Sequence, residues 1–118
     1  MRNIEMSPLP IILICDRDAF FREALRNFLF AAGYSQVEVA VTVREALAKL
    51  RRECYGYVLI GVSRPLSRIW RLARVVQRRQ PRAKIIFLVS ADDQPLIEGS
   101  SFEYVIKEYV FSNLLDLI

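Results

Sequence analysis

The sequence contains 118 residues, 53% of them hydrophobic and 25% charged, with a formal net charge of +4. This length and balance are typical of one folded domain and exclude a disordered chain. The sequence has no histidine, which excludes histidine-dependent acid–base catalysis, Cys/His zinc sites and Ser-His-Asp hydrolysis.

Residues 1–10 contain one arginine, two prolines and no long apolar core. This composition indicates a flexible leader and not a signal peptide, so we expect the folded domain to occupy residues 11–118. No run approaches the roughly 18 to 20 apolar residues that a membrane helix needs. We therefore expect a cytoplasmic protein without a membrane partner.

Two strand–helix units are predicted in the first half of the chain. Residues 11–15 are a short apolar run of the length that strands have, and residues 36–41 are a short second strand rich in valine. A helix over residues 19–32 follows the first strand, with Asp18 in the position of an N-cap and Gly33 where the helix ends. Its expected apolar stripe consists of Phe21, Ala24, Leu25, Phe28 and Ala32.

A capping box predicts the second helix. Thr42 precedes a periodic apolar segment, and Glu45 follows at the spacing at which the two side chains satisfy each other's backbone. Cys15 in the first strand and Cys54 near the end of this helix are interpreted as small buried hydrophobic residues and not as a disulfide. The expected buried stripe of the helix consists of Val43, Ala46, Leu47 and Leu50.

The run that best fits a buried central strand lies in the middle of the chain. Four apolar residues lie between Gly56 and Gly61, and a turn at Pro65 follows. A third helix is expected over residues 67–80. Its core face consists of Ile69, Leu72, Ala73 and Val76, and its basic face consists of Arg68, Arg71, Arg74 and Arg78.

The last third of the chain predicts two further strands, at residues 84–89 and 104–106. Residues 92–102, which lie between them, contain a proline, a glycine and two serines. We therefore expect at most one or two helical turns there. Residues 112–118 begin a final helix, whose apolar face consists of Leu114, Leu115 and Ile118.

The alternation of strands and helices predicts an α/β domain with a five-stranded, doubly wound parallel sheet. The carboxyl ends of parallel strands face one crevice, where ligands bind in such sheets. The residue that ends the predicted central strand is Gly61, which has no functional group.

Three segments together resemble a response-regulator receiver domain. Residues 12–29, with Asp16 at the strand exit and Phe-Arg-Glu-x-Leu soon after, are similar to the opening of the NarL/FixJ branch. Ser90, followed by alanine, is similar to the family's Thr/Ser-Ala, and residues 104–108 to its aromatic-x-x-Lys-Asp ending. The resemblance covers residues 11–118 and implies a CheY-like strand order 2-1-3-4-5. The stretch between Ser90 and Lys107 departs from the family because it is about one helical turn shorter, so we expect the fourth helix to be shortened or missing.

In that family, an aspartate at the end of the third strand accepts a phosphoryl group, and two acids after the first strand help to bind Mg²⁺. The alignment places Gly61 at the acceptor position. Asp16 matches one of the two acids, and Arg17 stands in place of the other. The resemblance therefore implies a degenerate pseudo-receiver without its phosphoacceptor.

Charge argues against a metal site in this pocket. Asp16 beside Arg17 and Lys107 leaves a local charge near +1, and like charges a few Å apart repel by about 1 to 4 kcal/mol per pair. Mg²⁺ gains little from a single carboxylate. We expect no bound Mg²⁺, no other cofactor, no phosphorylation at the family position and no enzymatic activity.

The remaining family positions are Ser90, Lys107 and Tyr104. The matching serine and lysine hold the phosphoryl group in the family, and the matching aromatic residue is a switch that reports it to the surface. Without phosphate, Lys107 is expected to pair with Asp16, and Arg17 to reach into the pocket or cap it. Two interpretations stay open: these side chains are relics kept for packing, or the internal cations lock one switch state.

The basic face of the predicted third helix also has two interpretations. The stretch from Arg64 to Lys84 contains eight basic residues and no acidic one. This face is either a solvated helix surface or a contact site for an acidic partner or a nucleic-acid backbone.

We therefore expect a phosphorylation-independent receiver that acts as a protein-interaction or dimerisation module, followed in the full chain by an output domain such as a C-terminal DNA-binding domain. The first and last helices, where Phe30 lies off the apolar stripe, offer a route of association. One alternative is a sensor that binds a small anion or metabolite in the vacant pocket through Arg17 and Lys107. Another is nucleic-acid contact through the basic helix face.

Overall fold

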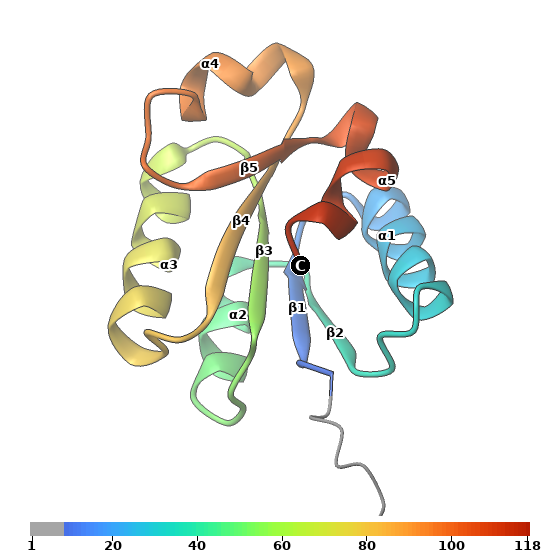
Figure 1. Cartoon of the computed structure of the whole chain (residues 1–118). Helices are drawn as coiled ribbons and strands as arrows, with labels where there is room; N and C mark the ends of the chain where they lie inside the picture. Colours follow the sequence, from blue (N-terminus) through green and yellow to red (C-terminus); the bar gives the residue numbers. More distant parts are fainter. Residues whose placement is uncertain (1–8) are drawn as a thin grey trace, which may run out of the picture.

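The computed structural model describes residues 9–118. The predicted leader, residues 1–10, lies almost wholly outside the described residues, and its flexibility stays a prediction. A five-stranded parallel sheet with strand order β2-β1-β3-β4-β5 forms the centre of the domain (Figure 1), which confirms the predicted fold class and order. The strands are β1 Ile12–Cys15, β2 Val37–Ala40, β3 Tyr57–Gly61, β4 Lys84–Val89 and β5 Glu103–Ile106.

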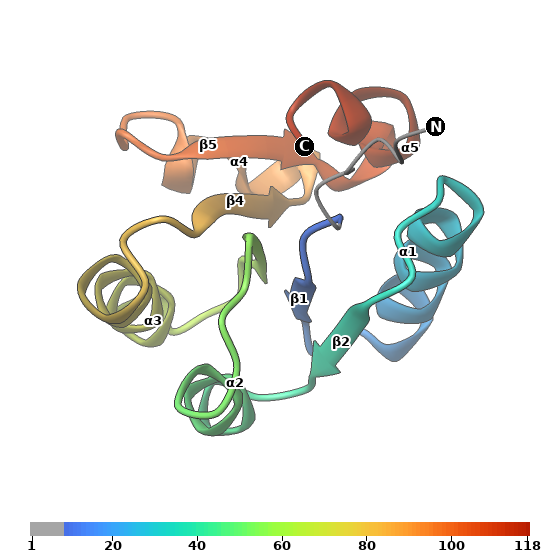
Figure 2. The ribbon, with the colours of Figure 1, turned by 60° about the horizontal axis from the view of Figure 1, so that its bottom comes forward.

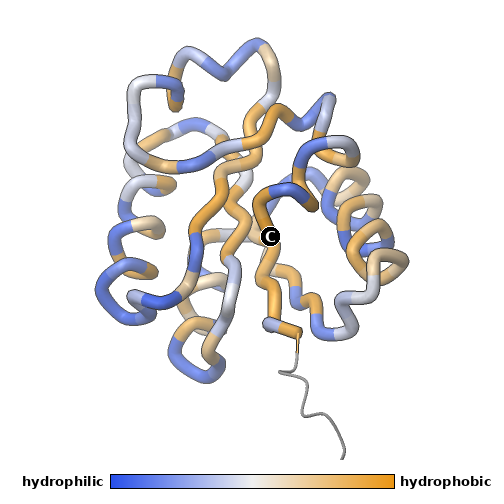
Figure 3. Tube along the Cα trace, in the orientation of Figure 1, coloured by the Kyte–Doolittle hydropathy of each residue, from blue (hydrophilic) through white to orange (hydrophobic). Residues whose placement is uncertain are grey.

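Helices cover both faces of this sheet. α1 (Ala19–Ala31) and α5 (Val110–Asn113) lie on one face, and α2 (Val43–Leu50) and α3 (Leu66–Arg79) lie on the other (Figure 2). The strands consist mainly of hydrophobic residues, whereas the helices mix hydrophobic and hydrophilic ones (Figure 3). In the described part of the chain, no helix is both long and apolar enough to cross a membrane.

The strands divide the core into two layers because successive side chains point to opposite faces. Ile12 and Ile14 pack with α1 and α5, whereas Leu13 and Cys15 pack with α2 and α3. Both faces of β1 are therefore buried, which explains its continuous apolar run.

Two predicted N-caps are confirmed. Asp18 Oδ1 accepts a hydrogen bond from the Phe21 amide at 3.1 Å and begins α1. Thr42 Oγ1 accepts one from the Glu45 amide, also at 3.1 Å, and begins α2. Gly33, with φ of 104°, follows α1 in a conformation that favours glycine.

The fourth helix is short, as predicted. α4 (Gln94–Ile97) has four residues, with Pro95 in its first turn and Ile97 fully buried. A cluster of three aromatic rings fills the neighbouring space between α3, β4 and the segment before β5. Ring centroids are 5.6 Å apart for Trp70 and Phe87 and 5.1 Å apart for Phe87 and Phe102, both edge to face.

The predicted stripe of the first helix needs one correction. Leu25 and Leu29 are its fully buried residues, whereas Ala32 is exposed. Leu29 lies one turn after Leu25 on the same face, and Ala32 comes after the last helical residue, where the chain leaves the helix.

Two further expectations are wrong in detail. The final helix starts at Val110, not at Ser112, and continues as a 3₁₀ turn. Val110 and Leu114 anchor it while Leu115 is exposed, because the tighter turn moves Leu115 off the sheet face. Cys54 is exposed because it lies in the loop after α2.

Candidate functional site

The carboxyl ends of β1 and β5 are joined by an ion pair. Lys107 Nζ lies 2.8 Å from Asp16 Oδ2, and the side chains are 20% and 4% exposed. The predicted pairing of these residues is therefore confirmed. Because both charges are largely removed from water, the pair resists screening by salt better than a surface pair would.

Further contacts hold each partner of this pair in place. The Asp18 amide donates a hydrogen bond to Asp16 Oδ1 at 2.9 Å, and Arg22 Nη1 donates one to the Asp16 carbonyl at 2.8 Å. Lys107 Nζ also lies 4.5 Å from the centroid of the Phe21 ring. Asp16 is consequently held by its own loop and by Lys107 at its carboxylate, and by Arg22 of α1 at its backbone carbonyl.

The carboxylate of Asp16 lies directly against Gly61 at the end of β3. An ideal Cβ at position 61 would lie 2.5 Å from Asp16 Cγ and closer still to Oδ2. Real Cβ atoms do not approach another atom so closely, so any residue with a side chain would force Asp16 to move. The place where a phosphoacceptor side chain would begin is therefore already filled.

Arg17 lies on the other side of this site. Its exposed side chain lines a cavity of about 810 Å³ between α2 and the start of α3, together with Gly61 and Ser63. Lys107 does not line this cavity. The two cations that were expected to share one pocket thus face different surroundings, one of them a buried carboxylate and the other an open groove.

Ser90 and Tyr104 form hydrogen bonds with partners outside the ion pair. Ser90 follows β4, and its carbonyl accepts a hydrogen bond from the Asp93 amide at 3.0 Å. Tyr104 is half-buried, and its hydroxyl accepts a hydrogen bond from Gln94 Nε2 at 3.0 Å. The aromatic residue at the family's switch position is therefore tied to α4.

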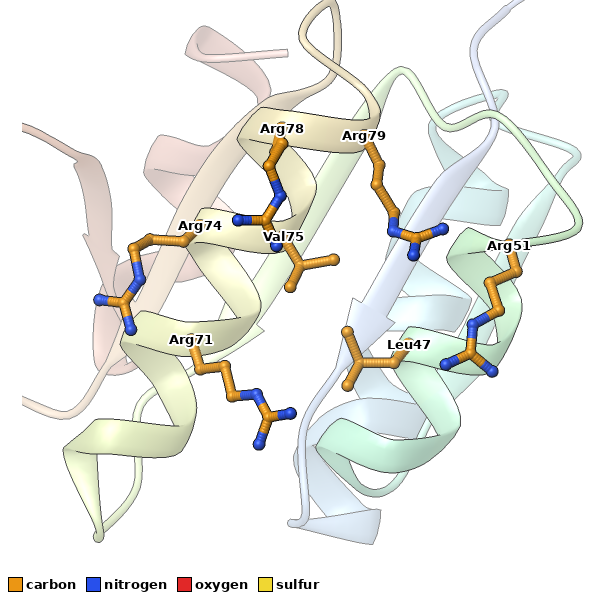
Figure 4. A pocket seen from close by; sticks show the side chains of 7 residues that line it. All are labelled: Leu47, Arg51, Arg71, Arg74, Val75, Arg78 and Arg79. Carbon is orange, nitrogen blue, oxygen red and sulfur yellow. The ribbon is translucent and has the colours of Figure 1, made fainter.

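The exposed face of α3 forms one wall of a groove that continues along α2. The core and basic faces predicted for this helix are both confirmed. A second cavity, of about 400 Å³, adjoins the first and shares Arg51 and Arg71 with it. Figure 4 shows Arg71 and Arg79 extending from α3 toward α2, with Leu47 and Val75 between the helices.

Sequence reasoning missed the contribution of α2 to this groove. Arg44 and Arg51 are spaced by two helical turns around Leu47, which places them on one face. The doubly wound order puts α2 beside α3 on the same side of the sheet, so this spacing was the signal that could have identified the second wall.

Solved receiver-domain structures are similar to this chain over nearly its whole length. The response regulator TrrA from Thermotoga maritima, in complex with Mg²⁺-BeF, has 26% identity and a TM-score of 0.77, covering 92% of this chain and 96% of that chain. The receiver domain of NtrC4 from Aquifex aeolicus has 19% identity and a TM-score of 0.73, covering 92% and 93%. The chemotaxis response regulator CheY4 of Vibrio cholerae has 20% identity and a TM-score of 0.73, covering 91% and 97%.

No family model and no curated protein matches the sequence. The structural matches nevertheless agree with the resemblance seen in the motifs. The chain has the CheY-like fold of response-regulator receiver domains.

Proposed function

We propose that this receiver domain of a response regulator works without phosphorylation and acts by associating with protein. The observation that carries the proposal is the position of Asp16, which fills the space above Gly61 and pairs with Lys107 at 2.8 Å. A phosphorylated receiver needs an acceptor side chain at this place. Here the carboxylate of Asp16, which follows β1, occupies the space and pairs with Lys107.

Three contacts support the interpretation that one switch state is held permanently. Lys107 ties β5 to β1 through Asp16, and Tyr104 bonds to Gln94 of α4. The carboxylate of Glu108 accepts a hydrogen bond from the Ala91 amide at 3.0 Å, which ties the end of β5 to the turn after β4. None of these contacts needs a phosphoryl group. The chain's own residues therefore hold the segments that follow β1, β4 and β5 together.

The surface that supports protein association lies on α1 and the C-terminal segment. Seven large hydrophobic residues are exposed in the described part of the chain, and five of them lie on these two elements. They are Phe20, Phe30, Tyr109, Phe111 and Leu115. The two elements touch through Phe28 and Phe111, whose ring centroids are 4.9 Å apart. Large apolar side chains that are exposed together on neighbouring elements are typical of interaction surfaces.

The alternative of a small-anion sensor that binds through both Arg17 and Lys107 is less well supported. Lys107 is engaged by Asp16 and covered by Phe21, so it is not free to bind an anion beside Arg17. The NarL/FixJ branch, the C-terminal output domain, the cytoplasmic location and the absence of enzymatic activity stay predictions from the sequence.

Phosphorylation independence is tested with a small-molecule phosphodonor and Mg²⁺. We expect no phosphoryl adduct in the intact mass and no shift of the amide resonances around Gly61. A stoichiometric adduct accompanied by such shifts would show that the domain is a working receiver and would refute the proposal.

Two variants separate the causes of this behaviour. Gly61→Asp alone should remain unlabelled, because Asp16 obstructs the new side chain and Arg17 opposes the metal. Adding Arg17→Asp creates a set of three carboxylates and should give measurable Mg²⁺ binding. Rapid labelling of the single variant Gly61→Asp would show that neither Asp16 nor Arg17 prevents phosphorylation.

A further inference from the structure

The groove between α2 and α3 carries a dense and unneutralised positive charge. Six arginines line its larger cavity and five line the smaller one, with Arg51 and Arg71 common to both. Within residues 9–118, the ion pairs of the domain involve Arg26 and three lysines, so none of the groove arginines has a carboxylate partner. Asp16, paired with Lys107, is the one acidic residue of the lining.

The arginines lie on the two walls of the groove, along its length. Arg44 comes from α2 and Arg51 from the position just after it, and Arg68, Arg71 and Arg78 come from α3. The 14 residues of α3 give this wall a length of about 21 Å. A wall of this length can contact several successive phosphates of one nucleic-acid strand.

The chemistry of the lining distinguishes between possible polyanions. Guanidinium groups bind phosphate oxygens in pairs, and the groove uses arginine throughout. An acidic amphipathic helix would need a continuous row of apolar contacts. The larger cavity has apolar residues in its lining, among them Val41, Val43 and Ile69, but the smaller one has only Leu47 and Val75 beside five arginines, so the row does not extend along the groove. A single small anion would use only a fraction of a site that extends over both cavities.

We propose that the groove between α2 and α3 binds the phosphate backbone of a single-stranded nucleic acid. No aromatic, asparagine or glutamine side chain lines either cavity, so the groove offers no platform for base stacking and no amide for reading bases. Binding is therefore independent of sequence and carried by charge. This site is separate from the face on α1 and the C-terminal segment, and the two proposals can fail independently.

The test is binding of the 118-residue chain to a fluorescent single-stranded DNA oligonucleotide of mixed sequence at several salt concentrations. With roughly four phosphates in the groove, log K should fall against log salt with a slope of about −3. The variant Arg51→Gln/Arg71→Gln should weaken binding at least about tenfold at low salt and reduce the slope by about 1.4.

A matched control removes the same charge elsewhere. Arg26→Gln/Arg82→Gln changes two arginines that line neither cavity, and it should weaken binding much less than the groove variant. Equal weakening by the two double variants would overturn the proposal, because net charge alone would then explain binding. Binding of polyglutamate but not of the oligonucleotide would also overturn it and assign the groove to an acidic protein.

Discussion

At the scale of single residues, Asp16 and position 61 share one small space between the ends of β1 and β3. A buried carboxylate is costly unless it is paired and hydrogen-bonded, and Asp16 is both. The absence of a side chain at position 61 is part of the same arrangement, since a Cβ there would displace the carboxylate from Lys107. The glycine at position 61 and the ion pair between Asp16 and Lys107 therefore depend on each other.

This coupling predicts the effect of Gly61→Ala. The added methyl group overlaps Asp16, so we expect the free energy of unfolding to fall by about 1 to 3 kcal/mol. In an Asp16→Ala background the same substitution should cost much less, because the carboxylate is absent. Chemical denaturation of the four proteins of this double-mutant cycle measures the coupling.

Gly99→Ala provides the control for this cycle. Gly99 has no atom within 4 Å of an added Cβ and no positive φ. Its substitution should be neutral or slightly stabilising. If Gly61→Ala behaved like Gly99→Ala, or if its cost were unchanged without Asp16, Asp16 would not be the group that occupies this space.

A second prediction concerns Cys15 and alkaline pH. Burial, and then the charge of Asp16, raise the pKa of the Cys15 thiol from 9.0 to about 12. The folded state therefore keeps a proton that the unfolded state loses above pH 9. The stabilisation is complete below pH 9 and is lost as the pH rises toward 12, by about 1.4 kcal/mol per pH unit.

The two cysteines provide a matched comparison. Cys15→Ala should lower stability at pH 7, and its difference from the parent should shrink by about 2 kcal/mol between pH 9 and 10.5. Cys54→Ala, at an exposed thiol, should show no such trend. Burial and a hydrogen bond to Glu38 also raise the pKa of Tyr55, but this contribution is common to all three proteins and cancels. A constant difference for Cys15→Ala would contradict the prediction.

At the scale of elements, the sequence predicts well where local and tertiary preferences agree. Asp18 and Thr42 begin helices because their side chains satisfy free backbone amides, which is a purely local effect. The periodicity of α3 separates Ile69 and Leu72 from Arg68 and Arg71 without any knowledge of the fold. Such features were predicted almost to the residue.

The C-terminal segment was predicted less well because its packing, and not its local propensity, decides its form. The predicted start at Ser112 rested on the leucines that follow, but Val110 is the residue that first enters the core. The candidate site shows the same limit. The motifs predicted the pair between Asp16 and Lys107, but the contact of Asp16 with Gly61 depends on the distance between β1 and β3. No pattern in a single sequence gives that distance.

At the scale of the whole molecule, the domain presents two chemically opposite surfaces. The arginine groove lies over α2 and α3, and the exposed aromatic residues lie on α1 and the C-terminal segment, on the other face of the sheet (Figure 2). Because the sheet separates them, both surfaces can be used at the same time. A second copy of the domain would approach the apolar side, since two arginine grooves repel each other.

The apolar side predicts self-association. Its charges are mixed, with Glu23 and Arg26 one turn apart on α1, and a surface that carries both signs can pair with a second copy of itself. We expect the solution mass to rise from monomer toward dimer with protein concentration.

Phe20→Glu, at a side chain that is 87% exposed, should hold the protein as a monomer without lowering its stability. Val41→Glu adds the same charge beside the arginine groove and should leave association unchanged. A parent protein that stays monomeric at every concentration would rule out self-association, and equal effects of the two variants would place the interface elsewhere.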